Sequence, residues 1–168
     1  NSGSLLVDAD GDGDLDLYAA NGSSENYGQP GLYQDRLYLN DGNGSFSHRP
    51  QNLPEITFPT NTVITIDYDR DGDLDVFIAS RQDAKIAWFE NLGQGNFGSQ
   101  LDLSTTADRG RFVVLADLDG DGDQDVVASS YRDDDESNDK ITGCENKDGA
   151  GTFGPQQIIV TEVEGPEA

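Results

Sequence analysis

Carboxylates recur at every second position in a short stretch near the N-terminus. Residues 8–17 read DADGDGDLDL, and near-copies stand at 67–76 (DYDRDGDLDV) and 117–126 (DLDGDGDQDV). All three fit the pattern D-x-D-x-D-G-x-x-D. Four carboxylates held about 4–5 Å apart repel one another, by up to roughly 4 kcal/mol per pair at an effective dielectric near 20, unless a cation lies among them. The pattern therefore indicates a cation-binding loop that occurs three times.

The donor atoms in these stretches indicate which cation. They are hard oxygens, and no His or Cys lies nearby, which argues against zinc and copper. Magnesium prefers a tighter octahedron that keeps several waters, whereas calcium accepts many protein oxygens. We therefore predict calcium.

The first half of each loop is similar to an EF-hand, with oxygens at positions 1, 3 and 5 and a Gly at position 6. An EF-hand needs a Glu at position 12, where this chain has Ala19, Ile78 and Ala128. The last acid comes instead at position 9, and the residues on both sides are β-rich, as in SLLVD before the first loop and LDLYAA at its end. Each loop is thus expected to join two strands of a hairpin.

The wider pattern resembles the FG-GAP or VCBS repeat, the blade unit of integrin-α-like β-propellers. Each copy continues with a third apolar segment that ends in Asn40, Asn91 or Asn146, followed by a Gly-rich turn, a Phe and a last strand. The resemblance covers nearly the whole chain and implies an all-β fold of three four-stranded antiparallel propeller-type blades with calcium-binding hairpin loops. We place the blades at residues 1–57, 58–107 and 108–168, as one structural unit.

The resemblance also implies the ligands of three calcium ions. In each loop the carboxylates at positions 1, 3, 5 and 9 would bind the ion, and the residue at position 7 would contribute its backbone carbonyl. The residues so assigned are Asp8, Asp10, Asp12, Asp14 and Asp16 in the first loop, Asp67, Asp69, Asp71, Asp73 and Asp75 in the second, and Asp117, Asp119, Asp121, Asp123 and Asp125 in the third.

Composition restricts partners and compartment. With 33 acidic and 10 basic residues the formal net charge is −23, so nucleic acid and anionic membranes are not expected partners, and no membrane insertion is expected. The single Cys144 excludes an intramolecular disulfide and is expected to be a small packing residue. Open carboxylate loops usually load calcium where the ion is millimolar, so we expect an extracellular or cell-surface protein.

No catalytic constellation is present in the sequence, and His48, the only histidine, is expected to be a surface residue. We therefore expect a protein that is not an enzyme. Three function classes stay open: an adhesion or ligand-binding module for a protein or glycan, a subunit of an extracellular filament or surface layer, and a lectin-like or accessory domain of a secreted enzyme. The connection over residues 21–35 is a candidate contact surface for a ligand.

The number of blades raises the question of what completes the fold. Closed propellers need at least about four blades, so this chain is expected either to be part of a larger propeller or to associate with itself head-to-tail, into a ring or an open polymer. Uncovered apolar faces are expected near residues 5–7 and 158–160. Inside the blades, Phe46, Phe97, Phe153 and Trp88 are expected to be core residues.

Overall fold

The protein is described by a computed structural model in which residues 3–22, 32–80, 84–104, 110–130 and 140–161 are placed. Most of the connection over residues 21–35 lies outside this described part of the chain. The described residues form twelve β-strands. The strands are β1 (Ser4–Val7), β2 (Asp16–Ala19), β3 (Arg36–Asn40), β4 (Phe46–His48), β5 (Thr62–Ile66), β6 (Asp75–Ser80), β7 (Lys85–Phe89), β8 (Leu101–Ser104), β9 (Gly110–Ala116), β10 (Asp125–Ser130), β11 (Lys140–Cys144) and β12 (Gln157–Thr161).

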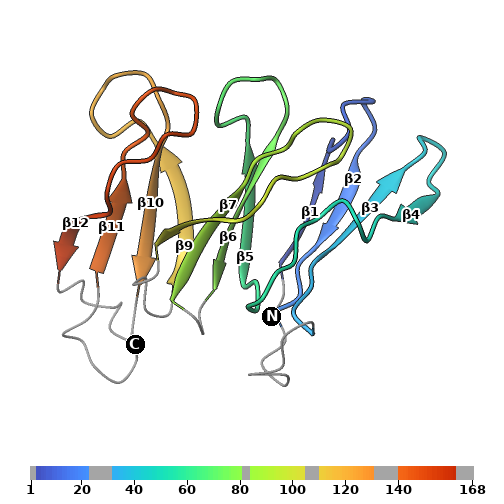
Figure 1. The fold of residues 1–168 in the computed structure, drawn as a ribbon, viewed down its shortest axis with the longest axis horizontal. Coiled ribbons are helices and arrows are strands. Elements are labelled where there is room, and N and C mark those ends of the chain that lie inside the picture. The colour runs from blue at the N-terminus through green and yellow to red at the C-terminus, as the bar shows by residue number, and fades with distance from the viewer. Residues whose placement is uncertain (1–2, 23–31, 81–83, 105–109, 131–139, 162–168) are drawn as a thin grey trace, which may run out of the picture.

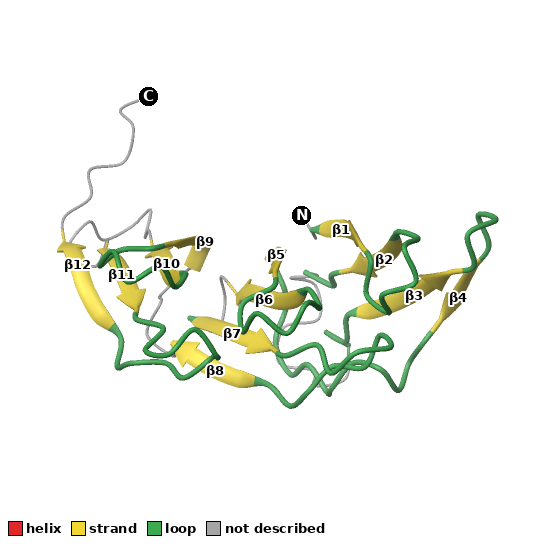
Figure 2. Cartoon of the chain, turned by 90° about the horizontal axis from the view of Figure 1, so that it is seen from above, coloured by secondary structure: helices red, strands yellow, loops and turns green. Residues whose placement is uncertain are grey.

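The strands form three four-stranded sheets in chain order, which we call blade 1 (β1–β4), blade 2 (β5–β8) and blade 3 (β9–β12). Every strand pairing is antiparallel. The blades stand side by side in a curved row, and the first strands contact one another in turn, β1 with β5 and β5 with β9 (Figures 1 and 2). The predicted all-β fold of three antiparallel blades is confirmed, whereas the blade boundaries stay a prediction.

Alternating side chains give each blade two apolar faces, because successive residues of a strand point to opposite sides of the sheet. In β6, Val76 and Ile78 face blade 1, whereas Phe77 and Ala79 face blade 3. All six residues of β6 are buried, as expected for a strand that is covered on both faces.

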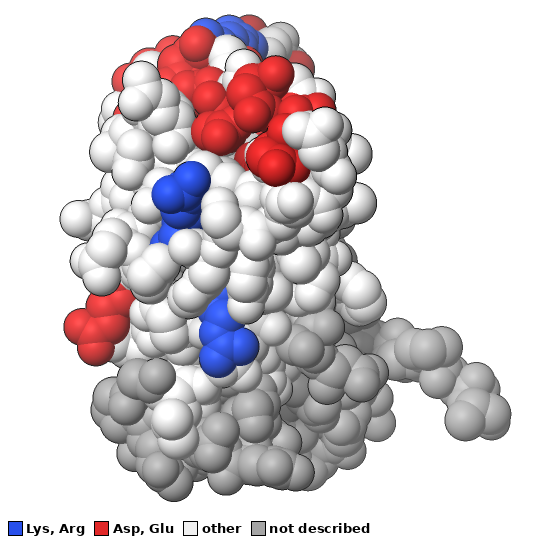
Figure 3. Space-filling model, turned by 90° about the vertical axis from the view of Figure 1, so that its right-hand side faces the viewer, with Lys and Arg blue, Asp and Glu red and all other residues white. Residues whose placement is uncertain are grey.

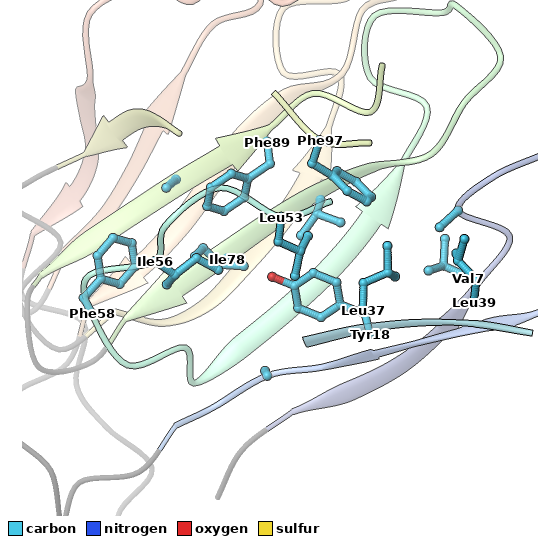
Figure 4. Packing of buried hydrophobic residues seen from close by; sticks show 14 residues of the cluster. Val7, Tyr18, Leu37, Leu39, Leu53, Ile56, Phe58, Ile78, Phe89 and Phe97 are labelled. Carbon is cyan, nitrogen blue, oxygen red and sulfur yellow. The ribbon is translucent and has the colours of Figure 1, made fainter. Parts of the chain in front are cut away.

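The hydrophobic core consists of the two spaces between neighbouring blades. The cluster between blades 1 and 2 also takes in Leu53, Ile56 and Phe58 from the connection that joins them (Figure 4). The cluster between blades 2 and 3 is built around aromatic rings, with Tyr68 stacked on Phe153 at 5.1 Å between ring centroids. Cys144 is buried in this second cluster, as the sequence predicts.

The expected core aromatics separate into two groups. Phe97 and Trp88 are buried and Phe153 is partly buried, whereas Phe46 is 47% exposed. The prediction that Phe46 is a core residue is therefore wrong. The physical reason is that this Phe packs on the blade that precedes its own, and in the described structure no blade precedes blade 1.

A buried carboxyl, that of Asp35, directly precedes strand β3 of blade 1. Asp35 is 2% exposed, and it accepts hydrogen bonds from the Tyr18 hydroxyl (2.8 Å) and from the backbone N–H of Asn21 (2.6 Å). Burial raises the pKa of Asp35 from 3.8 to about 6, although these hydrogen bonds oppose the shift. Between pH 4 and 6 the folded protein therefore holds a proton on this carboxyl that the unfolded chain has released. The stability that this bound proton contributes falls as the pH rises through that window.

Replacing Phe97 with Ala should lower the free energy of unfolding by about 3–5 kcal/mol, because it leaves a cavity between blades 1 and 2. Phe46→Ala is the matched control and should cost less than about 1 kcal/mol in a dilute sample, since half of that ring is already in water. Urea denaturation of both variants measures the difference. Equal losses in the two variants would contradict this description of the core.

Replacing Asp35 with Asn should remove the pH dependence that burial of this carboxyl creates. An Asn side chain can accept from Asn21 N–H and donate to the Tyr18 hydroxyl, so both hydrogen bonds have a replacement. The unfolding free energy of Asp35→Asn relative to the unmodified protein should rise between pH 4 and 7, by up to roughly 3 kcal/mol. Urea denaturation at each pH, with chelator present, measures this difference, and parallel pH profiles for the two proteins would be the contrary result.

Candidate metal centres

The three aspartate-rich loops are the β1–β2, β5–β6 and β9–β10 hairpin connections, and all three lie at the same edge of the row of blades (Figure 1). The hairpin placement is therefore as predicted. Acidic side chains accordingly gather at that edge in the space-filling view (Figure 3).

Carboxylate oxygens converge in each loop. In every loop one oxygen from each of three aspartates lies within 4.8 Å of the others. The converging residues are Asp8, Asp10 and Asp16 in the first loop, Asp67, Asp69 and Asp71 in the second, and Asp117, Asp119 and Asp125 in the third. Nine of the fifteen predicted ligands thus lie in three compact clusters, although their roles as ligands stay a prediction.

The other six predicted ligands lie outside these clusters, and several shape the loop backbone. Asp12 Oδ1 accepts from Asp14 N–H at 2.9 Å, and Asp121 Oδ1 accepts from Asp123 N–H at 2.8 Å. Bonds of this kind, from a side chain to the backbone two residues on, hold a tight turn. The backbone carbonyls of Asp14, Asp73 and Asp123, predicted as ligands, stay a prediction too.

The aspartate at position 9 has a structural role that the sequence pattern does not reveal. Asp75 is fully buried, and its two oxygens accept backbone N–H groups from Tyr68 (3.0 Å) and Asn91 (2.7 Å). Tyr68 lies in the loop, and Asn91 follows the third strand β7. Asp16 and Asp125 make the corresponding pairs of bonds, to Ala9 and Asn40 and to Leu118 and Asn146. In each blade this carboxylate therefore ties the loop to the third strand.

Burial and like charge oppose ionisation of three of the loop aspartates, Asp10, Asp69 and Asp75. The pKa of Asp75 is raised to about 7, chiefly because burial disfavours the charged form, with further repulsion from Asp69 and Asp71. Burial is also the largest cause of the raised pKa of Asp10 and of Asp69. A bound cation would favour the ionised form of such groups.

The residues present fit a calcium ion. Each cluster offers only carboxylate oxygens, the donor type that calcium prefers. In the second loop Asp67 Oδ1 is buried and has no hydrogen-bond partner in the described part of the chain. A buried carboxylate oxygen without a donor is costly, and a cation at this cluster would satisfy it.

Glycines of a second turn make room for the acid at position 7. A side-chain carbon on Gly93 would lie 3.2 Å from Asp73 Oδ2, and one on Gly149 would lie 2.7 Å from Asp123 Oδ1. Both glycines have φ between +60° and +90°, a backbone conformation that other residues adopt rarely. Glycine at these two positions therefore lets the aspartate-rich loop pack closely against the turn that follows the third strand.

Arg70 connects two of the loops and was not singled out by the sequence pattern. Its guanidinium donates to Gly122 O and forms an ion pair with Asp123 at 2.8 Å, so a base from the second loop reaches the third. Arg70 has a φ of 65°, and the equivalent residues Gly11 and Gly120 have φ of 76° and 83°. The one signal in the sequence was this Arg at a position where the other two loops have Gly.

Replacing Asp75 with Ala should lower the unfolding free energy even when chelator is present. The change leaves the Tyr68 and Asn91 N–H groups buried without acceptors, which costs about 1–3 kcal/mol for each group. Asp71→Ala removes an exposed acid from the same loop and should have little effect or a small stabilising one in chelator, since it relieves repulsion. Urea denaturation in chelator compares the two variants, and equal stability of both would contradict the tie between loop and strand.

Comparison with known proteins identifies repeats in the sequence. A model of the FG-GAP-like repeat matches residues 8–78 and, in a second overlapping match, residues 67–128. The two matches begin at the first aspartates of the first and second loops. No curated protein sequence matches the chain.

Solved structures share the fold at low sequence identity. A lectin from Agrocybe aegerita that specifically recognises non-reducing terminal N-acetylglucosamine matches 95% of this chain with a TM-score of 0.60 and 18% identity. The V. cholerae biofilm matrix protein Bap1 matches 89% with a TM-score of 0.51 and 21% identity, and the Photorhabdus luminescens Tc holotoxin pore matches 96% with a TM-score of 0.50 and 24% identity. The chain spans 39% of the lectin, 19% of Bap1 and 7% of the holotoxin chain.

Proposed function

The chain belongs to the FG-GAP-like repeat family, and from that premise we propose that it is a non-enzymatic, extracellular calcium-binding module for adhesion or ligand binding. One calcium ion binds in each of the three hairpin loops. The observation that carries the proposal is the convergence of carboxylate oxygens to within 4.8 Å in all three loops. The ions hold the three loops in their folded conformation and so keep the turns at this edge of the blades in place.

In the first and third loops the acids at positions 1, 3 and 9 would hold the ion, and the oxygens of the buried acid at position 9 already accept backbone N–H groups. In the second loop the converging acids are those at positions 1, 3 and 5, namely Asp67, Asp69 and Asp71. Each carboxylate oxygen has two lone pairs, so an oxygen that accepts one hydrogen bond can still bind a cation. Bound calcium would neutralise the repulsion that the cluster otherwise carries into the folded state.

Two considerations support an extracellular role. Sites built from open carboxylate loops have the affinity range of extracellular calcium modules, which load at millimolar calcium. Among the proteins of similar fold are a lectin that recognises terminal N-acetylglucosamine and a biofilm matrix protein. The part of the chain that the structure describes contains no helix long and apolar enough to cross a bilayer.

The proposal of a non-enzymatic module is supported by how the titratable groups are placed. The only histidine, His48, is exposed, and its ring lies beside that of Tyr38 in a tilted arrangement, with 5.0 Å between ring centroids. The converging carboxylates lie in the three loops and are assigned to metal. An adhesion or matrix role needs no further chemistry, because a rigid sheet edge and its turns form the contact surface.

Calcium should raise the melting temperature, and Asp71→Ala should reduce the calcium stoichiometry from three towards two. The physical reason is that the ligands converge in the folded loop and disperse in the unfolded chain, so binding stabilises the folded state by mass action. Isothermal titration calorimetry counts the sites, and differential scanning calorimetry with calcium or chelator measures the shift. Asp102→Ala, which removes an exposed acid of β8 that pairs with Lys85, is the control of equal charge and should still bind three.

A thermal transition that stays in place in excess chelator would contradict the proposed stabilisation by calcium. An unchanged count of three in Asp71→Ala would contradict the assignment of the second loop. Magnesium at the same concentration should shift the transition less, because these loops do not enforce an octahedron that retains water.

A further inference from the structure

In blades 2 and 3, a phenylalanine after the second turn packs on the preceding blade. Phe97 of blade 2 is 8% exposed and lies in one cluster with Ala9 and Leu39 of blade 1. Phe153 of blade 3 contacts Tyr68 and Trp88 of blade 2, with ring centroids 5.1 and 5.5 Å apart. The same residue type thus makes the same kind of contact at both blade interfaces.

The third member of this series, Phe46, has no such contact in the described structure. It pairs with Asn40 in the β3–β4 register, and Tyr38 pairs with His48, so these side chains share the face of blade 1 that points away from blade 2. Phe46 is 47% exposed and Leu6, on the same blade, is 57% exposed. We call this surface the outer face of blade 1.

At the opposite end of the row, blade 3 exposes the kind of surface that receives this phenylalanine. Leu118 occupies the loop position that Ala9 and Tyr68 occupy in the other blades. Its side chain is 53% exposed, and those of Phe112 and Ile159 are 65% and 48% exposed.

A pocket of about 140 Å³ opens on this surface at Gly143, the position where blade 2 has Trp88. It is lined by Leu118, Gly143 and Ile159 and by acids that include Asp119 and Glu145. We call this surface the outer face of blade 3.

The two outer faces also differ in charge. Blade 1 carries the exposed bases Arg36 and Arg49, and Figure 3, which views that end of the row, shows basic groups on a mostly uncharged surface below the acidic edge. The pocket on blade 3 is lined by Glu145 and by Asp119 and Asp125, and the two aspartates are predicted calcium ligands, so Glu145 is the acid that stays free when calcium is bound. In a chain of net charge −23, a basic end and an acidic end favour contact between unlike ends over contact between like ends.

We propose that the outer face of blade 3 binds the outer face of blade 1 of a second copy of this chain, with Phe46 as the anchor in the pocket beside Leu118 and Ile159. The contact continues the two blade interfaces inside the chain and goes beyond the proposed function. Because two different faces meet, the association is heterologous, and it builds either a closed ring or an open filament.

Backbone geometry gives the contact a register. Between blades 1 and 2, Asn91 Nδ2 and Gly95 N–H both donate to the carbonyl of Ala9, at 3.0 Å each. The counterparts of these groups are Asn40 Nδ2, Gly44 N–H and the Leu118 carbonyl. Asn40 Nδ2 makes the bond within its own blade, to Leu15 O at 3.2 Å, as Asn91 does to Leu74 O. In the second copy, Asn40 and Gly44 would donate to Leu118 O if the contact follows the interface between blades 1 and 2. The interface between blades 2 and 3 lacks the Asn bond, because Asn146 Nδ2 has no hydrogen-bond partner in the described part of the chain.

Sedimentation velocity of the full chain in calcium tests the proposal, with variants at both ends. The unmodified protein should sediment as species larger than its 18.1 kDa monomer, with a weight-average mass that rises with concentration. Phe46→Asp and Ile159→Asp should each shift the assembly towards monomer and raise the dissociation constant at least about tenfold, as expected for an anchor at the centre of an interface. Leu92→Asp, at a site that is 61% exposed on blade 2, is the control and should assemble as the unmodified protein does.

Mixing the two monomeric variants identifies the geometry. Phe46→Asp keeps an intact blade 3 face and Ile159→Asp keeps an intact blade 1 face, so an equimolar mixture should form a 1:1 dimer that grows no further. The calcium stoichiometry of the same samples is measured in parallel. A variant that still binds calcium is folded, so a loss of assembly can be told apart from a failure of the proposed calcium binding. A monomeric unmodified protein at high concentration and high salt, an assembly that tolerates Phe46→Asp, or a mixture that stays monomeric would each overturn the proposal.

Discussion

In each blade a buried aspartate joins the aspartate-rich loop to the third strand, because its two oxygens accept backbone N–H groups from both. In blade 2 these are the bonds from Tyr68 and Asn91 to Asp75. Burying a carboxylate costs free energy unless its oxygens accept hydrogen bonds. The fold therefore requires both of these bonds. They place the loop against the end of the sheet, where the remaining carboxylates then have to converge.

Where the carboxylates converge they repel one another, and the proposed metal ion would neutralise this repulsion. Burial and neighbouring acids raise the pKa of Asp75 to about 7 and also raise that of Asp69, which shows how strongly the metal-free loop disfavours the charges it contains. A divalent cation converts the same arrangement from repulsive to attractive. The ion pair between Arg70 and Asp123 neutralises one of these negative charges without a metal, because the base of the second loop reaches the acid of the third.

The sequence alone was sufficient for the parts of the structure that depend on local pattern. The three loops, their flanking strands and the burial of Phe97 and Trp88 follow from residue types that repeat at fixed spacing. The exposure of Phe46 could not be predicted in this way, because burial at that position depends on a neighbouring blade and not on the repeat itself. Arg70 and Asp35 were missed for a related reason, since each acts through a contact between segments that the pattern does not relate.

The central claim is that each loop binds a calcium ion, and a crystal structure grown in calcium tests it most directly. Anomalous difference density should show one peak in each of the three carboxylate clusters, with oxygens of the clustered aspartates about 2.3–2.6 Å from the peak, as in other calcium sites. In the second loop, Asp67 Oδ1 should be among those oxygens. Well-ordered loops without anomalous density at millimolar calcium would contradict the account.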